Sequence, residues 1–141
     1  MNLQSWQFFS ILSAFFAALT TIFGKLGVSE INSNLATLIR VLVILIFNFC
    51  LVYFRNEWQG LSNISGRSLV FLVASGLATG ASWLFFYRAL QLGQASQVAP
   101  VDKLSVVGVL ILSFLFLGEV PSLKVIAGSA LILAGSLVII L

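Results

Sequence analysis

Long apolar runs alternate with short polar segments along the chain, and this alternation predicts the architecture. The apolar runs cover residues 5–27, 35–54, 67–90, 97–117 and 123–141, and polar turns separate them. A helix needs about 20 mostly apolar residues to cross the hydrocarbon of a bilayer, and each run meets that need. The runs are continuous, whereas strands of a membrane β-barrel alternate polar and apolar residues. Residues 1–141 are therefore expected to form one all-α integral membrane domain with five transmembrane helices.

The composition leaves the chain no surface suited to water. Hydrophobic residues make up 60% and charged residues 8% of the sequence, whereas soluble domains carry about 25% charged residues. The net charge of +3 is small and the positive residues are scattered, so we expect membrane lipid rather than nucleic acid as a partner. With no histidine and a single cysteine, Cys50, the chain lacks the usual groups for metal binding or acid–base catalysis. We expect neither an enzyme nor a cofactor.

Ionisable residues at the start of the fourth run are the first candidates for function. Asp102 is the only carboxylate inside an apolar run, and it lies beside Lys103 and close to Pro100. An ionised side chain in hydrocarbon costs about 2.5–3.5 kcal/mol on insertion scales, so these groups should face other helices or a water-filled cavity. Neighbouring residues of a helix point about 100° apart. We therefore expect Asp102 to pair with Arg40 rather than with Lys103, and we expect Pro100 to bend the helix or make its start irregular.

Other charged and aromatic residues fall toward the same membrane face. Lys25 and Arg88 lie near helix ends, where we expect their long side chains to snorkel, so that the charged groups reach the lipid headgroups. Trp83 and Tyr87 share one face of the third helix and either form an interfacial belt or line a cavity. The glycine pairs 76/80 and 128/135 are expected to be packing seams. The candidate residues for solute binding or coupling are Arg40, Asp102, Lys103, Trp83, Tyr87, Lys25 and Arg88.

Several short motifs resemble one known family. These are residues 83–90 (Trp-Leu-Phe-Phe-Tyr-Arg-Ala-Leu), 98–100 (Val-Ala-Pro) and 116–119 (Phe-Leu-Gly-Glu), followed by Gly128 and Gly135. Their order and spacing resemble the EamA domain of the drug/metabolite transporter superfamily, and Arg40 fits the same pattern. The resemblance covers essentially the whole chain. It implies a transporter of small metabolites in the plasma (inner) membrane, and it implies that this chain is one half of a ten-helix fold of inverted repeats.

The expected function is therefore that of a secondary transporter working by alternating access. The small multidrug-resistance proteins of the same superfamily use an acid in helix 1, but the first run here has Lys25 instead. The surplus positive charge favours an anionic or zwitterionic solute. No phosphate-binding loop of the G-x-x-x-x-G-K-[ST] type exists to use ATP. The alternative is a non-transporting assembly or accessory subunit, in which the charges only help packing.

The odd number of helices bears on the oligomeric state. Two copies in opposite orientations would reproduce an inverted repeat, so we expect a homodimer, with the antiparallel form as the first choice. Four Lys and Arg residues lie toward one membrane face (Lys25, Arg40, Arg88 and Lys103) and three toward the other (Arg55, Arg67 and Lys124). This near balance suits insertion in both orientations. If only the loops are counted, the second group places the N-terminus inside, and one orientation with a different partner chain becomes the alternative.

Overall fold

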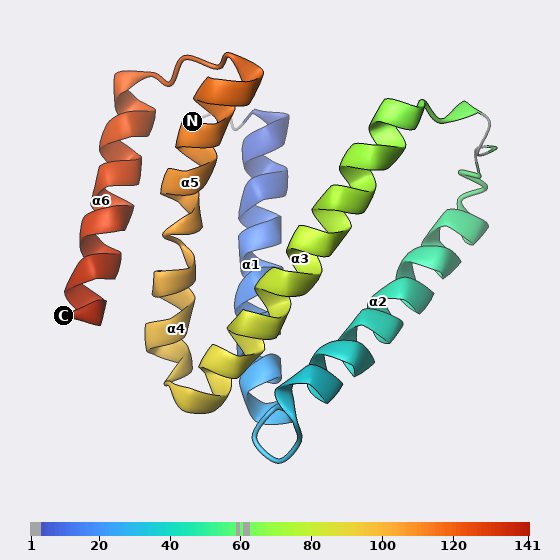
Figure 1. Cartoon of the computed structure of the whole chain (residues 1–141), viewed down its shortest axis with the longest axis horizontal. Coiled ribbons are helices and arrows are strands. Elements are labelled where there is room, and N and C mark those ends of the chain that lie inside the picture. The colour runs from blue at the N-terminus through green and yellow to red at the C-terminus, as the bar shows by residue number, and fades with distance from the viewer. Residues whose placement is uncertain (1–3, 59, 61–62) are drawn as a thin grey trace. The chain divides into compact units, whose positions relative to one another are not determined.

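The computed structural model describes residues 4–58, 60 and 63–141, and these residues form helices and connecting segments with no strand among them (Figure 1). In chain order the helices are α1 (Ser5–Gly27), α2 (Ser33–Phe54), α3 (Gly66–Leu92), α4 (Ala95–Asp102), α5 (Ser105–Leu112), the π-helix η2 (Ser113–Leu117) and α6 (Leu123–Ile140). The expectation of an all-α protein is confirmed.

The described residues contain five stretches of helix long and apolar enough to cross a membrane, as the sequence predicts. Four of them are single helices, and the fourth in chain order, Ala95–Leu117, combines α4, α5 and η2. Predicted and observed boundaries agree to within two residues. The third helix runs on to Leu92 and so includes Gln91, which was expected to lie in a turn.

The chain divides into two compact units, each described here by itself. One unit is Phe23–Gln91, which holds the end of α1, all of α2 and almost all of α3. In this unit α2 and α3 run antiparallel (Figure 1). Asn32 caps α2, because its side-chain oxygen accepts a hydrogen bond of 2.8 Å from the backbone N–H of Asn34. Val28 and Leu90 are fully buried and form the centre of this unit's small core.

The second unit joins Met1–Ile22 to Leu92–Leu141 and contains an interrupted helix. Between α4 and α5 the backbone changes from α-helical bonding to the tighter i→i+3 pattern. The N–H of Lys103 donates to the Pro100 carbonyl, and the N–H of Leu104 donates to Val101, both at 3.0 Å. Proline lacks an N–H and its ring crowds the preceding turn, whereas these bonds follow Pro100, so the proline alone does not account for the interruption. The predicted irregularity is confirmed, and it lies just after Pro100 rather than at the helix start.

The connection from η2 to α6 is built by two residues with clear roles. Gly118 has a φ of 68°, a left-handed conformation in which glycine avoids the strain that a side chain would bring, and it ends the π-helix. Ser122 is the N-cap of α6, because its side-chain oxygen accepts a hydrogen bond from the N–H of Val125. The chain then turns back, and α6 packs against α4 and α5.

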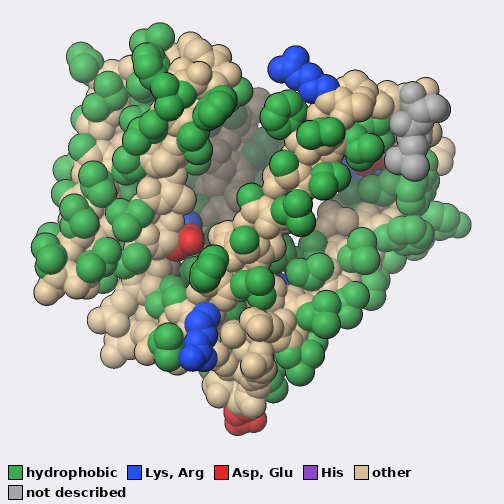
Figure 2. Space-filling model, in the orientation of Figure 1, with side chains coloured by type: hydrophobic (Ala, Val, Ile, Leu, Met, Phe, Trp, Pro, Cys, Tyr) green, Lys and Arg blue, Asp and Glu red, His purple; other side chains and the backbone are tan. Residues whose placement is uncertain are grey.

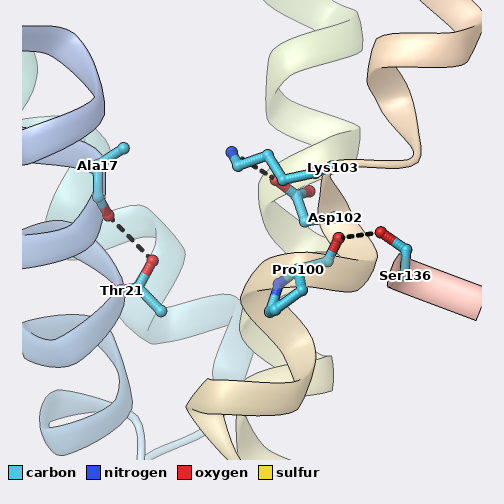
Figure 3. Close-up of polar contacts among 6 residues, drawn as sticks. All are labelled: Ala17, Thr21, Pro100, Asp102, Lys103 and Ser136. Carbon is cyan, nitrogen blue, oxygen red and sulfur yellow. Dashed lines mark hydrogen bonds and ion pairs between the residues drawn. The ribbon is translucent and has the colours of Figure 1, made fainter. Parts of the chain in front are cut away.

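Most large apolar side chains are exposed, and hydrophobic groups cover much of the visible face (Figure 2). In water such a surface would be unstable, whereas in a bilayer lipid tails cover it at no cost. Two of the buried polar residues form hydrogen bonds within their own helix: Thr21 donates to the Ala17 carbonyl (Figure 3) and Thr37 to the Ser33 carbonyl, both at 2.9 Å. The fold is thus suited to lipid.

The expected glycine seams are not close contacts within this chain. At Gly76, Gly80, Gly128 and Gly135 an added Cβ would meet nothing within 4 Å among the described residues. The glycine that does permit a close approach is Gly24, where a Cβ would lie 3.3 Å from the Tyr87 hydroxyl oxygen. Small residues allow a close approach only where another element comes near, and sequence spacing does not reveal where that happens.

Candidate functional site

Arg40, Trp83 and Tyr87 form a cluster between α2 and α3, here called the aromatic–arginine cluster. The centre of the Arg40 guanidinium lies 4.1 Å from the centroid of the Trp83 ring and 5.5 Å from that of Tyr87. Arg40 and Trp83 are half-buried and Tyr87 is buried. A cation over an aromatic ring gains about 0.5–1 kcal/mol when exposed and about 2 kcal/mol or more when desolvated. Three predicted site residues therefore lie together, with the two rings beside the arginine.

The hydrogen-bonding edges of Arg40 have no partner within its own unit. Among the described residues of Phe23–Gln91, no carboxylate forms an ion pair with Arg40 and no group accepts a hydrogen bond from it. A guanidinium carries five N–H donors in one plane, and they match the two oxygens of a carboxylate or phosphate. The two rings contact the cation but offer no conventional hydrogen-bond acceptor to it, so its N–H donors are left for another group. This arrangement suits the binding of an anion.

Tyr87 is held in place by the close approach of α1. The Cβ position of Gly24 lies 3.3 Å from the Tyr87 hydroxyl oxygen and 3.5 Å from the Leu90 side chain. A larger residue at this position of α1 would push against the tyrosine ring. Because the same ring lies 5.5 Å from the Arg40 guanidinium, the packing of α1 bears on the cluster through Tyr87.

Lys25, in the last turn of α1, and Arg88, near the end of α3, both make polar contacts with the last residues of α3. The Lys25 ammonium donates a hydrogen bond to the Leu90 carbonyl, one of the last carbonyls of α3. A cation at a helix C-terminus satisfies an orphan carbonyl and complements the helix dipole. Arg88 donates to the side-chain oxygen of Gln91 at 3.1 Å. Snorkelling of Lys25 and Arg88 to the headgroups stays a prediction, and the bond to Leu90 adds a contact within the protein for Lys25.

Asp102 and Lys103 lie at the interruption between α4 and α5. Their side chains form an ion pair with 3.6 Å between the Lys103 nitrogen and an Asp102 oxygen (Figure 3). The expectation that these neighbours could not satisfy each other is wrong. The backbone leaves α-helical geometry at Lys103, and the long lysine side chain folds back toward the acid. Both side chains are about half exposed, and exposed pairs contribute only about 0–1 kcal/mol, so the pair can open readily.

The expected pairing of Asp102 with Arg40 stays a prediction, since the two residues belong to different units.

Two residues that were not predicted from the sequence form hydrogen bonds close to these candidate residues. Ser136 of α6 donates a hydrogen bond of 2.8 Å to the Pro100 carbonyl (Figure 3). Gln91 donates to the carbonyls of Val28 and Ile31 at 3.1 and 2.7 Å. Gln91 follows Trp83 and Tyr87 at the i, i+4 spacing of one helix face, which was the available signal.

Apolar helices that can cross a membrane five times define a multi-pass membrane protein. The chain belongs to the EamA-like transporter family, which matches residues 4–141. It is 55% identical over 136 residues to a protein of Sinorhizobium sp named "Uncharacterized transporter in cobO 3'region", and the match covers 96% of each chain. No solved structure matches it. Family and relative together support a transporter role and point away from an enzyme.

Proposed function

We propose that this protein is a secondary transporter of a small anionic or zwitterionic metabolite. The observation that carries this proposal is the Arg40 guanidinium lying over Trp83 and Tyr87 with no carboxylate partner in the described part of its own unit. A cation without a counter-ion is costly near hydrocarbon. A solute carboxylate or phosphate that binds the N–H groups of Arg40 would supply a counter-charge, which no described residue of this unit provides. The aromatic rings would then limit the approach to the plane of the guanidinium.

The ion pair at the interruption of the fourth span supplies a second element of the mechanism. Asp102 and Lys103 are adjacent, half exposed and weakly coupled. Asp102 is the acid that would carry a proton if protons drive transport, and Lys103 could hold the anionic part of the solute while Asp102 is neutral. Broken helices are typical places for solute and ion binding in secondary transporters, and both residues lie at such a break. The bound solute would reach alternate sides by alternating access.

The proposed working unit is a homodimer in the cell (inner) membrane, with the two copies antiparallel. Five crossings put the two ends of the chain on opposite sides of the membrane. Two parallel copies cannot reproduce an inverted repeat, whereas two antiparallel copies can. The Sinorhizobium relative is matched over 96% of its own length, so that protein consists almost entirely of one such domain.

A thermal-shift screen of the purified protein tests the solute class. A ligand that binds the native state raises its melting temperature. We expect some carboxylates, phosphates or amino acids to raise the Tm of the wild type and to leave the Tm of Arg40→Ala unchanged. Organic cations serve as the control and should have no effect. Stabilisation by cations alone would contradict the proposal, and a response that persists in Arg40→Ala would remove Arg40 from the site. No response to any solute would favour the accessory subunit.

A further inference from the structure

Gln91 joins the last turn of α3 to the segment between α1 and α2. Its amide nitrogen donates two hydrogen bonds, to the carbonyls of Val28 at 3.1 Å and Ile31 at 2.7 Å. These carbonyls lie just before Asn32, the residue that caps α2. One side chain therefore fixes the place where α2 begins relative to the end of α3. We propose that Gln91 is a positioning residue that keeps Arg40 on Trp83 and Tyr87, a role that rests on the proposed function of Arg40 in solute binding.

The geometry of α3 explains how Gln91 acts on the cluster. Trp83, Tyr87 and Gln91 are spaced four residues apart and lie along one face of the helix. The first two contact the guanidinium of Arg40, which is about two turns into α2. The third holds the backbone at the start of that same helix. One stripe of α3 thus contacts α2 at Arg40 and the segment that leads into α2 at Gln91. Loss of the bonds from Gln91 would free the start of α2 to move Arg40 away from the rings.

Arg88 sets the orientation of the Gln91 amide. Its guanidinium donates to the amide oxygen at 3.1 Å. Because arginine can only donate, it binds the oxygen end of the amide and leaves the nitrogen end for the two backbone carbonyls. The Lys25 ammonium binds the Leu90 carbonyl independently and ties α1, rather than α2, to the end of α3. Gln91 is therefore the side chain on which the attachment of α2 depends.

The fluorescence of Trp83 reports the position of Arg40. The chain has three tryptophans, so a variant with Trp6→Phe and Trp58→Phe leaves Trp83 as the single emitter. In this background, acrylamide quenching is measured for the full chain in nanodiscs without any solute. The Arg40→Ala variant in this background gives the quenching constant of Trp83 when no guanidinium covers its ring. Gln91→Glu is isosteric and still accepts from Arg88, but its carboxylate cannot donate to the carbonyls of Val28 and Ile31.

We expect Gln91→Glu to raise the quenching constant at least halfway to the Arg40→Ala value. Arg88→Met, which frees the amide to rotate, should give a smaller change in the same direction and serves if Gln91→Glu does not fold. Gln94→Glu, the same substitution at an exposed position, is the control and should match the parent. Melting temperatures are recorded on the same samples, because a purely structural role would lower the Tm and leave quenching unchanged.

Wild-type quenching in folded Gln91→Glu, or in Arg88→Met where Gln91→Glu fails to fold, would overturn the proposal. So would an Arg40→Ala variant that quenches like the parent, since Arg40 would then not cover Trp83. The measurement uses no solute, so it can succeed or fail whatever the outcome of the thermal-shift screen. The positioning role of Gln91 and the solute class are thereby tested separately.

Discussion

Arg40 combines two chemical functions in one side chain. Its guanidinium lies over the rings of Trp83 and Tyr87, and its N–H groups are the part able to bind an anion. Lysine has a compact charge that can lie over a ring but offers no planar pair of donors. Lys25, by contrast, binds one backbone carbonyl, a task that needs only a single donor. The two residues should therefore respond differently to the same kind of exchange.

Exchange of lysine and arginine tests this difference. We expect Arg40→Lys to weaken the binding of a responding anion about tenfold or more, since each factor of ten corresponds to about 1.4 kcal/mol. Lys25→Arg keeps a donor for the Leu90 carbonyl and should change binding little. Both affinities come from the dependence of Tm on ligand concentration. Equal effects of the two variants would mean that a general positive field, rather than the arginine geometry, binds the solute.

The contact between Gly24 and Tyr87 makes a second prediction at this scale. Gly24→Val places a branched side chain within 3.3 Å of the tyrosine hydroxyl oxygen, and overpacking of this kind typically costs about 1–3 kcal/mol. Gly76→Val is the matched control, because the space around Gly76 is open. We expect a lower Tm in detergent for Gly24→Val only. Comparable losses in both variants would show that valine in the helix, and not Tyr87, causes the destabilisation.

At the scale of the elements, the interruption between α4 and α5 is the main departure from regular helix. The Pro100 carbonyl accepts a hydrogen bond from the N–H of Lys103 and another from the Ser136 hydroxyl. The second bond comes from α6, so it joins two spans of the same unit (Figure 3). The break, the ion pair beside it and the attachment to α6 form one local structure.

A double-mutant cycle measures this attachment. Ser136→Ala removes the hydrogen bond, and such bonds between membrane helices contribute about 0.6 kcal/mol on average and about 1.7 kcal/mol at most. In a Pro100→Ala background the helix can bond regularly, so we expect Ser136→Ala to cost less there. Unfolding in SDS provides the four free energies. An equal cost of Ser136→Ala in both backgrounds would mean that the hydroxyl does not depend on the break.

Helix positions could be predicted well because the length of an apolar run and the thickness of a bilayer are directly related. The irregularity near Pro100 and the N-cap at Ser122 also followed from the chemistry of single residues. The ion pair of Asp102 with Lys103 could not be predicted, since it depends on where the backbone leaves the helix. Gln91 was missed because a polar residue near a turn looks like part of the turn. The role of Gln91 depends on contacts between segments that are far apart in the sequence.

At the scale of the whole molecule, the distribution of positive residues bears on how the chain inserts. If four lie toward one face and three toward the other, as we expect from the sequence, the bias that normally fixes a single orientation would be nearly absent, whereas the loop residues alone would place the N-terminus inside. The large exposed apolar surface leaves ample area for a second copy as well as for lipid. An antiparallel homodimer would use this surface and complete the inverted repeat that one chain lacks.

Reporters at the C-terminus test the orientation. We expect both a cytoplasmic and a periplasmic reporter to be active when fused to this end, because half of the copies should insert each way. Adding two lysines to the 91–96 turn should shift the balance toward one orientation, which serves as an internal control. Activity of a single reporter, together with cross-linking of only monomers or parallel pairs, would contradict the antiparallel dimer.

Transport by the reconstituted protein tests the central claim most directly. Proteoliposomes are incubated with a mixture of small metabolites, and their contents are compared by mass spectrometry with those of empty liposomes and of liposomes containing Arg40→Ala. We predict that the wild type accumulates one or a few carboxylates, phosphates or amino acids, and that Arg40→Ala accumulates none of them. Selective accumulation of cations, or the same contents in all three preparations, would contradict the account of Arg40 as the solute-binding residue of an anion transporter.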